Sequence, residues 1–297
     1  MRVKLAYLGV VMVWTTTPLC IKWSSEGISF ILGVTARMSV GALCLLLIML
    51  LSRQRLAMHK AAIHTYIAAS VQIYLSMTIT YWAAQFIPSG WTSVIFGLSP
   101  FMTAFLAAAL LKESSLGWAR VFAYLLGVAG LAVMFVSAIE LNRLALIGMV
   151  AMLGSTFIHA VSAVWVKRIA AGLPAIQQIS GGLLFSLPLY YLTWFILDQG
   201  QLPSSIPDKT LYAILYLGGI ATTLGFALYY FLLTHLAATK VAMINMVTPV
   251  LSLLLGFGVN HEPLTVKIAI GTALILSALL IQQLAGRRWQ FGRGNRQ

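Results

Sequence analysis

Residues 99–113 read SPFMTAFLAAALLKE, and residues 248–262 read TPVLSLLLGFGVNHE. In both stretches a hydroxyl residue precedes a proline, an apolar run follows, and a glutamate comes thirteen positions after the proline. A single shift of 149 residues superposes the two prolines and the two glutamates without a gap, and it carries Tyr81 onto Tyr230. Proline is rare inside helices, because it removes a backbone donor and clashes with the preceding turn. Matched prolines in matched apolar segments therefore indicate a duplicated unit, the alternative being chance agreement between apolar segments.

The composition is that of a membrane protein. Of the 297 residues, 60% are hydrophobic and 8% are charged, and the mean hydropathy is +0.93, whereas soluble domains carry about 25% charged residues. Most of the surface must therefore face lipid. The net charge of +13 does not indicate a nucleic-acid partner, because the basic residues lie in short loops between apolar runs. Cys20 and Cys44 lie inside apolar runs and predict neither a disulfide framework nor a metal site.

Apolar runs long enough to cross a bilayer, about 20 residues each, occur ten times. The first run is followed by no small-x-small cleavage site, and we interpret it as an uncleaved crossing. The sequence therefore predicts an all-α polytopic membrane protein with ten transmembrane helices. The expected crossings are 4–22, 30–51, 62–86, 90–111, 117–138, 144–167, 174–197, 210–235, 240–259 and 265–285.

Charged residues in the loops orient these crossings. With both termini in the cytoplasm, fourteen lysines and arginines lie on the cytoplasmic side, and four lie outside: Lys22, Arg143, Lys209 and Lys267. By the positive-inside rule, this bias predicts a multi-pass protein of the plasma (inner) membrane with cytoplasmic N and C termini. Five helices is an odd number, so the second unit enters the bilayer inverted. We expect a first five-helix repeat over 1–140, an inverted second repeat over 141–288 and a basic cytoplasmic tail over 289–297.

With these features the chain resembles the drug/metabolite transporter superfamily, in particular its EamA-domain family. The resemblance rests on the two proline-to-glutamate stretches, on Trp14 in the first crossing, on Arg37 in the second and on Gly127-Val128-Ala129-Gly130 in the fifth. It covers about residues 5–285. The resemblance implies ten helices in a 5+5 inverted repeat and the export of small metabolites or amino acids.

No arrangement typical of an enzyme occurs in the sequence. There is no G-x-S-x-G motif, no Walker A loop and no pair of carboxylates within the predicted crossings. We therefore predict no enzymatic activity and no cofactor, and we interpret the chain as a secondary transporter of small molecules that works by alternating access within membrane lipid. Inverted repeats place the substrate near the midplane, where they meet. A lipid flippase or a polytopic membrane enzyme is the alternative hypothesis.

Two ionisable residues, Arg37 and His159, lie well inside the predicted crossings and away from their ends, where charge is costly. Arg37 is a candidate for binding a substrate carboxylate, and a structural role at helix-end carbonyls is the alternative. His159 shares a helix face with Ser155 and Ser162. It is a candidate for binding substrate or relaying a proton, and otherwise a neutral histidine bonded between helices. All six acidic residues lie at helix ends or in loops, so protons as a coupling ion would have to use His159, one of these acids or the substrate.

Aromatic and polar side chains recur at matched positions of the two repeats. Tyr81 corresponds to Tyr230 and Ser99 to Thr248, and we expect these four to line a central cavity, with plain helix packing as the alternative. The predicted substrate-binding residues are Trp14, Arg37, Tyr74, Tyr81, Trp82, Ser99, His159, Tyr230, Asn245 and Thr248.

The paired prolines are the predicted hinges. Pro100 and Pro249 each leave the carbonyl four residues earlier, at Phe96 and Asn245, without its helical donor. Such carbonyls must face protein or a watery cavity and not lipid. We expect these two positions to bend as the cavity opens to alternate sides, and a static kink is the alternative.

Overall fold

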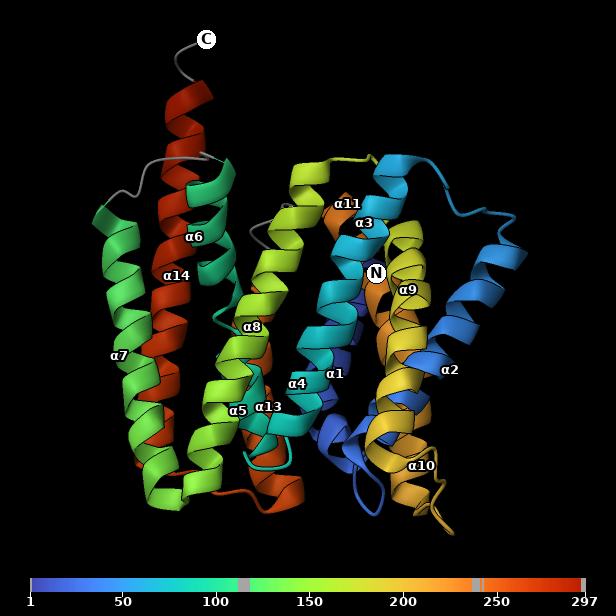
Figure 1. The fold of residues 1–297 in the computed structure, drawn as a ribbon. Helices are drawn as coiled ribbons and strands as arrows, with labels where there is room; N and C mark the ends of the chain where they lie inside the picture. The colour runs from blue at the N-terminus through green and yellow to red at the C-terminus, as the bar shows by residue number, and fades with distance from the viewer. Residues whose placement is uncertain (1, 112–117, 237–240, 242, 295–297) are drawn as a thin grey trace.

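Helices account for most of the residues that the structure, a computed structural model, describes: 2–111, 118–236, 241 and 243–294 (Figure 1). No strand occurs among these residues. The first half of the chain contains α1 (Arg2–Trp23), α2 (Phe30–Leu51), α3 (Lys60–Ser70), η1 (Val71–Ser76), α4 (Met77–Ala83), α5 (Ser89–Phe96), α6 (Ser99–Leu111) and α7 (Trp118–Leu141). The second half contains α8 (Arg143–Ile169), α9 (Ala175–Asp198), α10 (Asp208–Leu215), η2 (Tyr216–Leu224), α11 (Gly225–His235), α13 (Ile244–Asn260) and α14 (Val266–Gly294).

These elements make ten membrane crossings. Eight helical runs are long and apolar enough to span a bilayer, and α13 is a shorter apolar helix. The remaining crossing is the continuous run of α3, η1 and α4, whose backbone changes from α to π geometry at Val71 and back at Met77. The predicted ten-helix, all-α membrane fold is therefore confirmed.

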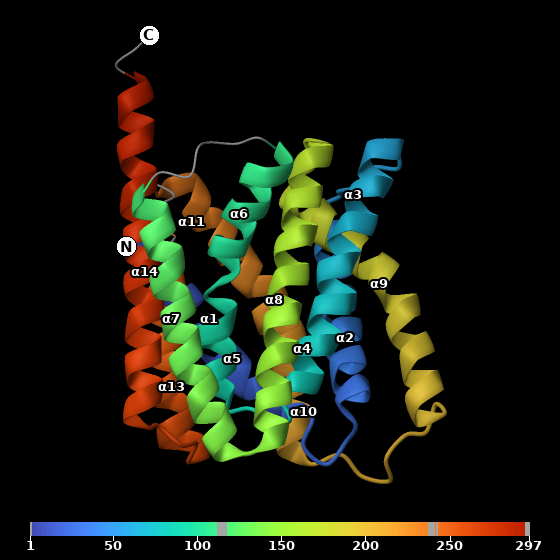
Figure 2. The same ribbon diagram turned by 60° about the vertical axis from the view of Figure 1, so that its left-hand side comes forward.

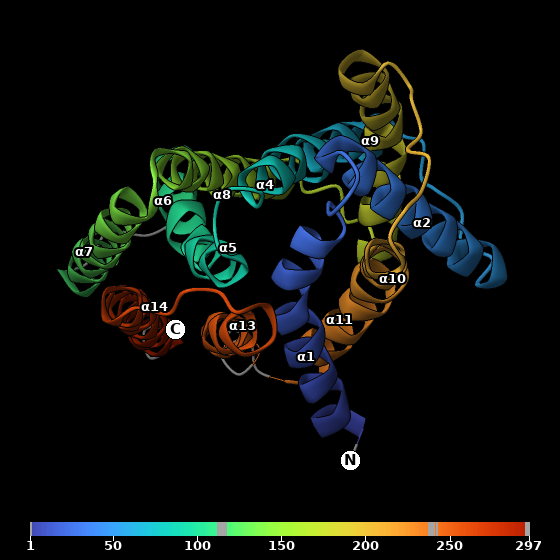
Figure 3. The ribbon, with the colours of Figure 1, turned by 90° about the horizontal axis from the view of Figure 1, so that it is seen from below.

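Helix packing repeats between the two halves. α1 packs against α11 and α13, and its counterpart α8 packs against α4 and α6. In the same way α2 packs against η2, and its counterpart α9 packs against α3 and η1. The pairs α2–α9, α5–α13 and α7–α14 join equivalent helices of the two halves, as Figure 3 shows from below. Because these contacts occur in matched pairs, the bundle consists of two equivalent five-helix units.

The bundle has two ends with different connections. Ten crossings bring the start of α1 and the end of α14 to one end, which we call the terminal end. The opposite end, called the Ser89 end, carries the connections after α1, α4, α7, α9 and α13. It lies at the bottom of Figures 1 and 2, and the C-terminal end of α14 lies at the top.

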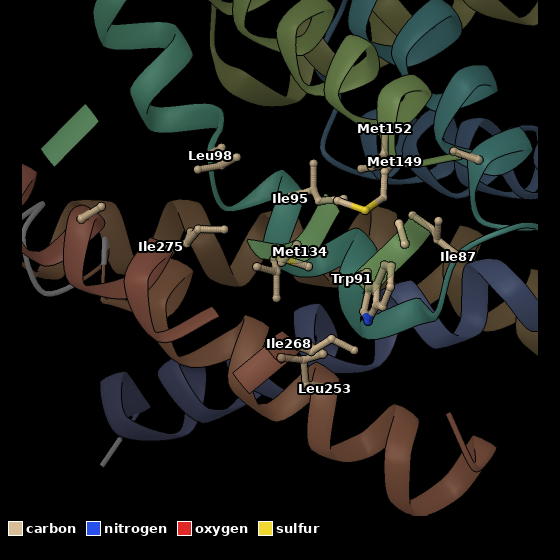
Figure 4. Close-up of a cluster of buried hydrophobic side chains, with 14 of the residues drawn as sticks. Ile87, Trp91, Ile95, Leu98, Met134, Met149, Met152, Leu253, Ile268 and Ile275 are labelled. Carbon is tan, nitrogen blue, oxygen red and sulfur yellow. The ribbon is translucent and has the colours of Figure 1, made fainter. Parts of the chain in front are cut away.

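A large cluster of buried apolar side chains surrounds α5 (Figure 4). Trp91 and Ile95 of α5 are at most 1% exposed and lie in one cluster with Met149 and Met152 of α8 and with Leu253 of α13. Helices already surrounded by lipid gain little from the hydrophobic effect when they associate, so close packing supplies most of the attraction. The cluster therefore fixes α5 against both halves of the chain.

Three element boundaries differ from the sequence prediction. The crossing expected at 90–111 is interrupted at Gly97 and Leu98, so α5 and α6 are separate helices. α13 begins at Ile244 and not at 240, and α14 continues to Gly294 and does not end at 285. The other boundaries lie within three residues of those predicted.

The two π-helical segments are a shared feature that the sequence did not predict. η1 covers 71–76, and the repeat shift of 149 residues carries it to 220–225, which overlaps η2 at 216–224. π-helical turns are rare, and they occur frequently at functional sites. Both lie in the third helix of their repeat.

Candidate functional site

Glu262 connects three parts of the chain at the Ser89 end. Its side chain is only 7% exposed. Its Oε2 accepts hydrogen bonds from the Ser89 backbone N–H and the Ser89 hydroxyl, both at 2.8 Å. Its Oε1 accepts a bond from Asn260 Nδ2 at 2.8 Å and lies 3.5 Å from Lys22 Nζ. We call Lys22, Ser89, Asn260 and Glu262 the Glu262 cluster, and it links α1, α5 and the end of α13.

Local geometry explains why Glu262 reaches α5. The helix α13 ends at Asn260, and His261 takes a left-handed conformation with φ of 53°. The Glu262 N–H then donates to the Gly256 carbonyl at 3.1 Å, and a Cβ at Gly256 would collide with Glu262 Oε2. On the other side, Pro88 supplies no side-chain cap for α5. The first backbone N–H groups of α5 have no acceptor within the helix, and they favour a negatively charged group such as the Glu262 carboxylate.

Further ion pairs hold the same end together. Lys209 Nζ lies 2.8 Å from Glu26 Oε2, and Lys267 pairs with Glu140. With Lys22 and Glu262, these make up the ion pairs between described residues, and each of them lies at the Ser89 end. The exposed pairs are worth at most about 1 kcal/mol each. The buried Glu262 cluster is therefore the main polar connection at this end.

Arg37 lies inside the bundle on α2 and is 6% exposed. Its Nη1 is 3.4 Å from the Tyr81 hydroxyl, and its guanidinium carbon is 5.9 Å from the centre of the Tyr81 ring. The Tyr81 hydroxyl is also 3.4 Å from Ser24 Oγ. Arg37 Nε is buried without a hydrogen-bond partner, and no carboxylate among the described residues pairs with this arginine. Arg37 therefore retains donors that the surrounding protein does not use.

A cavity of about 220 Å³ lies beside Tyr81, at the Ser89 end between α1 and α4. Its walls include Lys22, Ser25 and Tyr81. The hydroxyl of Ser25 is buried without a partner, and Lys22 Nζ holds Glu262 only at 3.5 Å. The cavity thus presents an unpartnered hydroxyl and both a positive and a negative side chain, Lys22 and Glu26, to anything that enters it.

Four of the predicted site residues come together in this region. Tyr81 belongs to an apolar cluster between α1, α2, α4, α9 and η2, and the half-buried Trp14 and Tyr74 pack against that cluster. The Tyr74 hydroxyl lies 2.6 Å from Thr193 Oγ1. Arg37 reaches the same region through Tyr81. Trp82 lies on the same helix as Tyr81 but packs edge-on against Phe86, with ring centres 4.9 Å apart.

His159 lies elsewhere, on α8 against α5. Its ring packs edge-on against Phe96 with centres 4.8 Å apart, and its Nδ1 is buried without a hydrogen-bond partner. The two serines predicted to share its face make other contacts. Ser155 bonds to Ser76, and Ser162 donates to the Ala68 carbonyl at 2.6 Å. These serines therefore fasten α8 to the third crossing, whereas His159 keeps an unused nitrogen.

The proline-containing helices hold the remaining predicted residues. Ser99 begins α6, while Asn245 is half-buried and Thr248 is buried on α13. No hydrogen bond between described residues joins Ser99 to Thr248. The side chain of Tyr230 lies outside the described residues, so its approach to Tyr81 stays a prediction.

Two stretches of the chain, residues 2–136 and 146–282, match the sequence profile of the EamA-like transporter family. Together they cover most of the chain, and each coincides with one of the two structural units. The chain belongs to the EamA-like transporter family. The resemblance stated from sequence and the 5+5 inverted repeat are thereby confirmed.

Several known proteins are similar to this chain over most of its length. An uncharacterized transporter of Bacillus subtilis (strain 168), YoaV, is 25% identical over 283 residues, which are 94% of this chain and 96% of YoaV. A second, YvbV of the same organism, is 22% identical and covers 82% of this chain and 79% of its own length. A crystal structure described only as that of a protein aligns with a TM-score of 0.64 over 97% of this chain and 98% of that chain. At 19% identity, that likeness shows the fold alone.

Within this EamA chain, sequence reasoning missed the partners of Glu262. It identified the glutamate as a repeat marker but did not connect it with Ser89, Asn260 or Lys22. One usable signal was present, because Pro88 followed by Ser89 and Gly90 is a plausible helix start that lacks its own acidic cap. Among the described residues, no group of three histidine, cysteine or acidic side chains comes together to hold a metal.

Proposed function

We propose that this EamA protein is a secondary transporter that exports small organic metabolites, amino acids among them, by alternating access. The observation that carries the proposal is the Glu262 cluster. It joins α13 of one repeat to α5 of the other through a carboxylate that is buried at one membrane face. A contact between repeats at one face is what alternating access must break and remake.

The packing of the helices supports this mechanism. At the Ser89 end α1, α5 and α13 pack against one another, and nearer the middle of the helices Ser252 of α13 donates to the Thr15 carbonyl of α1 at 2.9 Å. Nearer the terminal end, α6 packs against α8. We therefore assign the structure to a state closed at the Ser89 end, which the predicted orientation makes the outer face. Release of substrate there requires Glu262 to leave the amides of α5.

Substrate would contact the residues brought together beside α1, α2 and α4, namely Trp14, Arg37, Tyr74 and Tyr81. We propose that the two repeats cover residues 1–140 and 141–288, and that Pro100 and Pro249 are their hinges. If protons drive export, His159 is the residue to carry them, because its Nδ1 is buried without a partner and the described acids lie at the Ser89 end. Inverted-repeat transporters commonly bind substrate between such repeats.

Metabolite profiling tests the export function. Cells that produce the protein should accumulate at least one small metabolite in the medium, relative to cells without it. Cells that produce the Glu262→Gln variant at equal level should not, because an amide cannot replace the charged contacts to Ser89 and Lys22. If the medium of wild-type cells equals that of empty cells for every compound, the proposal fails.

A second candidate function, lipid translocation, has one observation in its favour. An apolar groove of about 540 Å³ lies at the terminal end beside Lys4, Tyr7, Leu236 and Met243. Its walls suit an acyl chain, and Lys4 suits an anionic headgroup. Transfer of fluorescent phospholipid between leaflets of proteoliposomes separates the two functions, since a metabolite exporter leaves that rate unchanged.

A further inference from the structure

We propose that the π-helical segment η2 shifts along its helix during transport, whereas η1, its counterpart in the first repeat, stays fixed. The inference rests on the proposed alternating access and locates one of its moving parts. Its starting point is the set of hydrogen bonds that fasten the two segments to neighbouring helices. These bonds differ between the segments, although both lie in the third crossing of their repeat.

Two neighbouring helices hold η1 in place. Tyr190 of α9 is fully buried, and its hydroxyl donates to the Ile73 carbonyl. From α8, the Ser155 hydroxyl donates to the Ser76 carbonyl at 2.7 Å, and the Ser76 hydroxyl donates to the Ser155 carbonyl at 3.0 Å. A shift of η1 along its helix would break these bonds. Because the groups are buried, they would then lack partners, which is costly.

The segment η2 is fastened far less. Between described residues, one side-chain hydrogen bond joins it to another helix, at 2.6 Å between the Tyr216 hydroxyl and Thr16 Oγ1 of α1. Its other side-chain bonds are internal. Thr222 donates to the Leu217 carbonyl at 2.8 Å, and Thr223 likewise bonds a carbonyl within the segment. Internal bonds move with the segment, so a shift of η2 costs a single bond to its surroundings.

Glycine contacts show which residues of α2 and α9 correspond. A Cβ added at Gly182 of α9 would lie 2.9 Å from the side chain of Ile73. A Cβ added at Gly41 of α2 would lie 3.1 Å from the side chain of Thr222, which is 149 residues after Ile73. Eight residues further along, α9 carries the tyrosine that bonds η1, and α2 carries Met49. Methionine has no donor, so α2 cannot hold η2 in the same way.

The serine pair of the first repeat also has no counterpart in the second. Gly225 comes 149 positions after Ser76. A Cβ added at Gly225 would lie 3.1 Å from Val13 of α1, whereas Ser76 meets Ser155 of α8. Glycine and valine side chains form no hydrogen bonds. The second repeat therefore lacks both of the fastenings that hold η1.

A shift of η2 would be felt at the closed Ser89 end. An α-helix turns by about 100° and rises by about 1.5 Å per residue, so a π turn that passes a residue moves it by these amounts. The helix α11 follows η2 and packs against α1 (Figure 3), where the rings of Trp14 and Tyr229 have centres 5.0 Å apart. α1 also carries Lys22 of the Glu262 cluster. Rotation of α11 therefore acts on that cluster through α1.

Hydrogen exchange of the purified full-length protein tests the difference between the segments. After correction for intrinsic rates, the amides of 216–224 should exchange at least about tenfold faster than those of 71–76, because fewer bonds restrain them. Tyr190→Phe keeps the ring and removes the donor, so exchange at 71–76 should speed up by about 2- to 10-fold. Tyr191→Phe is the matched control, because Tyr191 bonds to Ser39 and not to η1, and it should leave 71–76 unchanged.

A double substitution tests whether the shift serves transport. Val13→Ser with Gly225→Ser places in the second repeat the hydroxyl pair that the first has at Ser76 and Ser155. This variant should slow exchange at 216–224, and its export of the compound found in the medium should fall by at least about fivefold. Val13→Ser alone supplies one hydroxyl without its partner, so it should export as wild type.

Thr16→Val replaces the double variant if the latter does not fold. It removes the one side-chain bond that joins η2 to α1. Exchange at 216–224 and export should then both rise by about twofold or more, because the shift breaks one bond fewer.

Three results would overturn the inference. They are equal exchange in the two segments of the wild-type protein, unchanged exchange at 71–76 in Tyr190→Phe, and changed exchange at 216–224 with unchanged export. If wild-type cells export no compound, the proposed function fails instead, while the exchange rates still decide whether η1 and η2 differ.

Discussion

The segments 95–111 and 244–260 occupy the same place in the two repeats, yet one is broken and the other is continuous. Both contain a proline at the same position. In the first segment the helix stops at Phe96, and Pro100 falls in the first turn of α6, where its missing N–H costs least. In the second segment Pro249 lies inside α13. A shared proline therefore does not decide whether a helix breaks.

Two differences between the segments account for the contrast. Gly97 in the first repeat corresponds to Met246 in the second, and glycine is about 1 kcal/mol worse than a good helix former inside a helix. The second helix is also fastened at several points, by Ser252 to α1 and by Glu262 to α5. The comparison teaches that a duplicated motif interrupts the helix in one copy and leaves it continuous in the other.

The largest expected effect concerns the side of the membrane on which each end of the bundle lies. Cysteines placed at Arg55 and at Asp208, both exposed and at opposite ends of the bundle, should differ completely in intact cells. A membrane-impermeant thiol reagent should label the cysteine at 208 and leave that at 55 unmodified, because basic loops favour the cytoplasmic side. Labelling at 55 from outside would reverse the orientation and place the Glu262 cluster on the inner face.

The next effect tests the fastening of α13. Gly256→Ala places a Cβ against Glu262 Oε2 and 3.0 Å from Ser89 Oγ, so it should displace the carboxylate. We expect at least about tenfold loss of export, because bonds to a charged group are worth about 1.5–3 kcal/mol. In the Gly256→Ala variant, a cysteine introduced at Ser252 should also react faster with a thiol reagent added on the Ser89 side of the membrane than it does without that substitution. Gly258→Ala is the control, since nothing lies within 4 Å of a Cβ added there. If the two variants export equally well, the Glu262 cluster does not close the Ser89 end.

A smaller effect should follow from making the second repeat resemble the first. Met246→Gly should weaken α13 by about 1 kcal/mol, and local hydrogen exchange between 246 and 249 should speed up by roughly fivefold. Leu251→Gly, on the same helix but beyond the proline, gives the intrinsic cost of glycine alone. If both variants exchange alike across 246–249, glycine does not explain why 95–111 is broken.

The smallest effect concerns His159, which packs against Phe96 just before the break. His159→Gln should keep export at pH 7 within about fivefold and flatten its dependence on pH below about 7, since an amide does not titrate there. Export measured across that range in wild-type and variant cells provides the readout. A pH profile identical to that of wild type would leave His159 a packing residue only.

The sequence predicted those features that depend on local patterns. Apolar runs located the ten crossings, and the two proline-to-glutamate stretches revealed the duplication. The break at Gly97 escaped prediction, because a proline three residues later is equally compatible with a kink. The contact between Glu262 and Ser89 spans 173 residues, and pairing at that separation depends on how the two repeats pack.

The candidate site was predicted in part for the same reason. We predicted four of the site residues, Arg37, Trp14, Tyr74 and Tyr81, because polar and aromatic groups inside a membrane are costly unless they have a function. In the structure these four residues lie close together. We expected His159 to share one polar face with Ser155 and Ser162. Instead the two serines contact the third crossing and His159 contacts α5, a difference that helical periodicity alone cannot show. The cavity beside Lys22 and Ser25 depends on the connection after α1, whose sequence has no regular period.

The two π-helical segments bear on the ancestry of the chain. A π turn accommodates one residue more than an α turn, and such a change usually marks an insertion that the surrounding fold has absorbed. Since η1 and η2 overlap after the 149-residue shift, the simplest history places that insertion in a single five-helix ancestor, before its gene was copied. The glycine at 97 and the methionine at 246 would then record what changed afterwards.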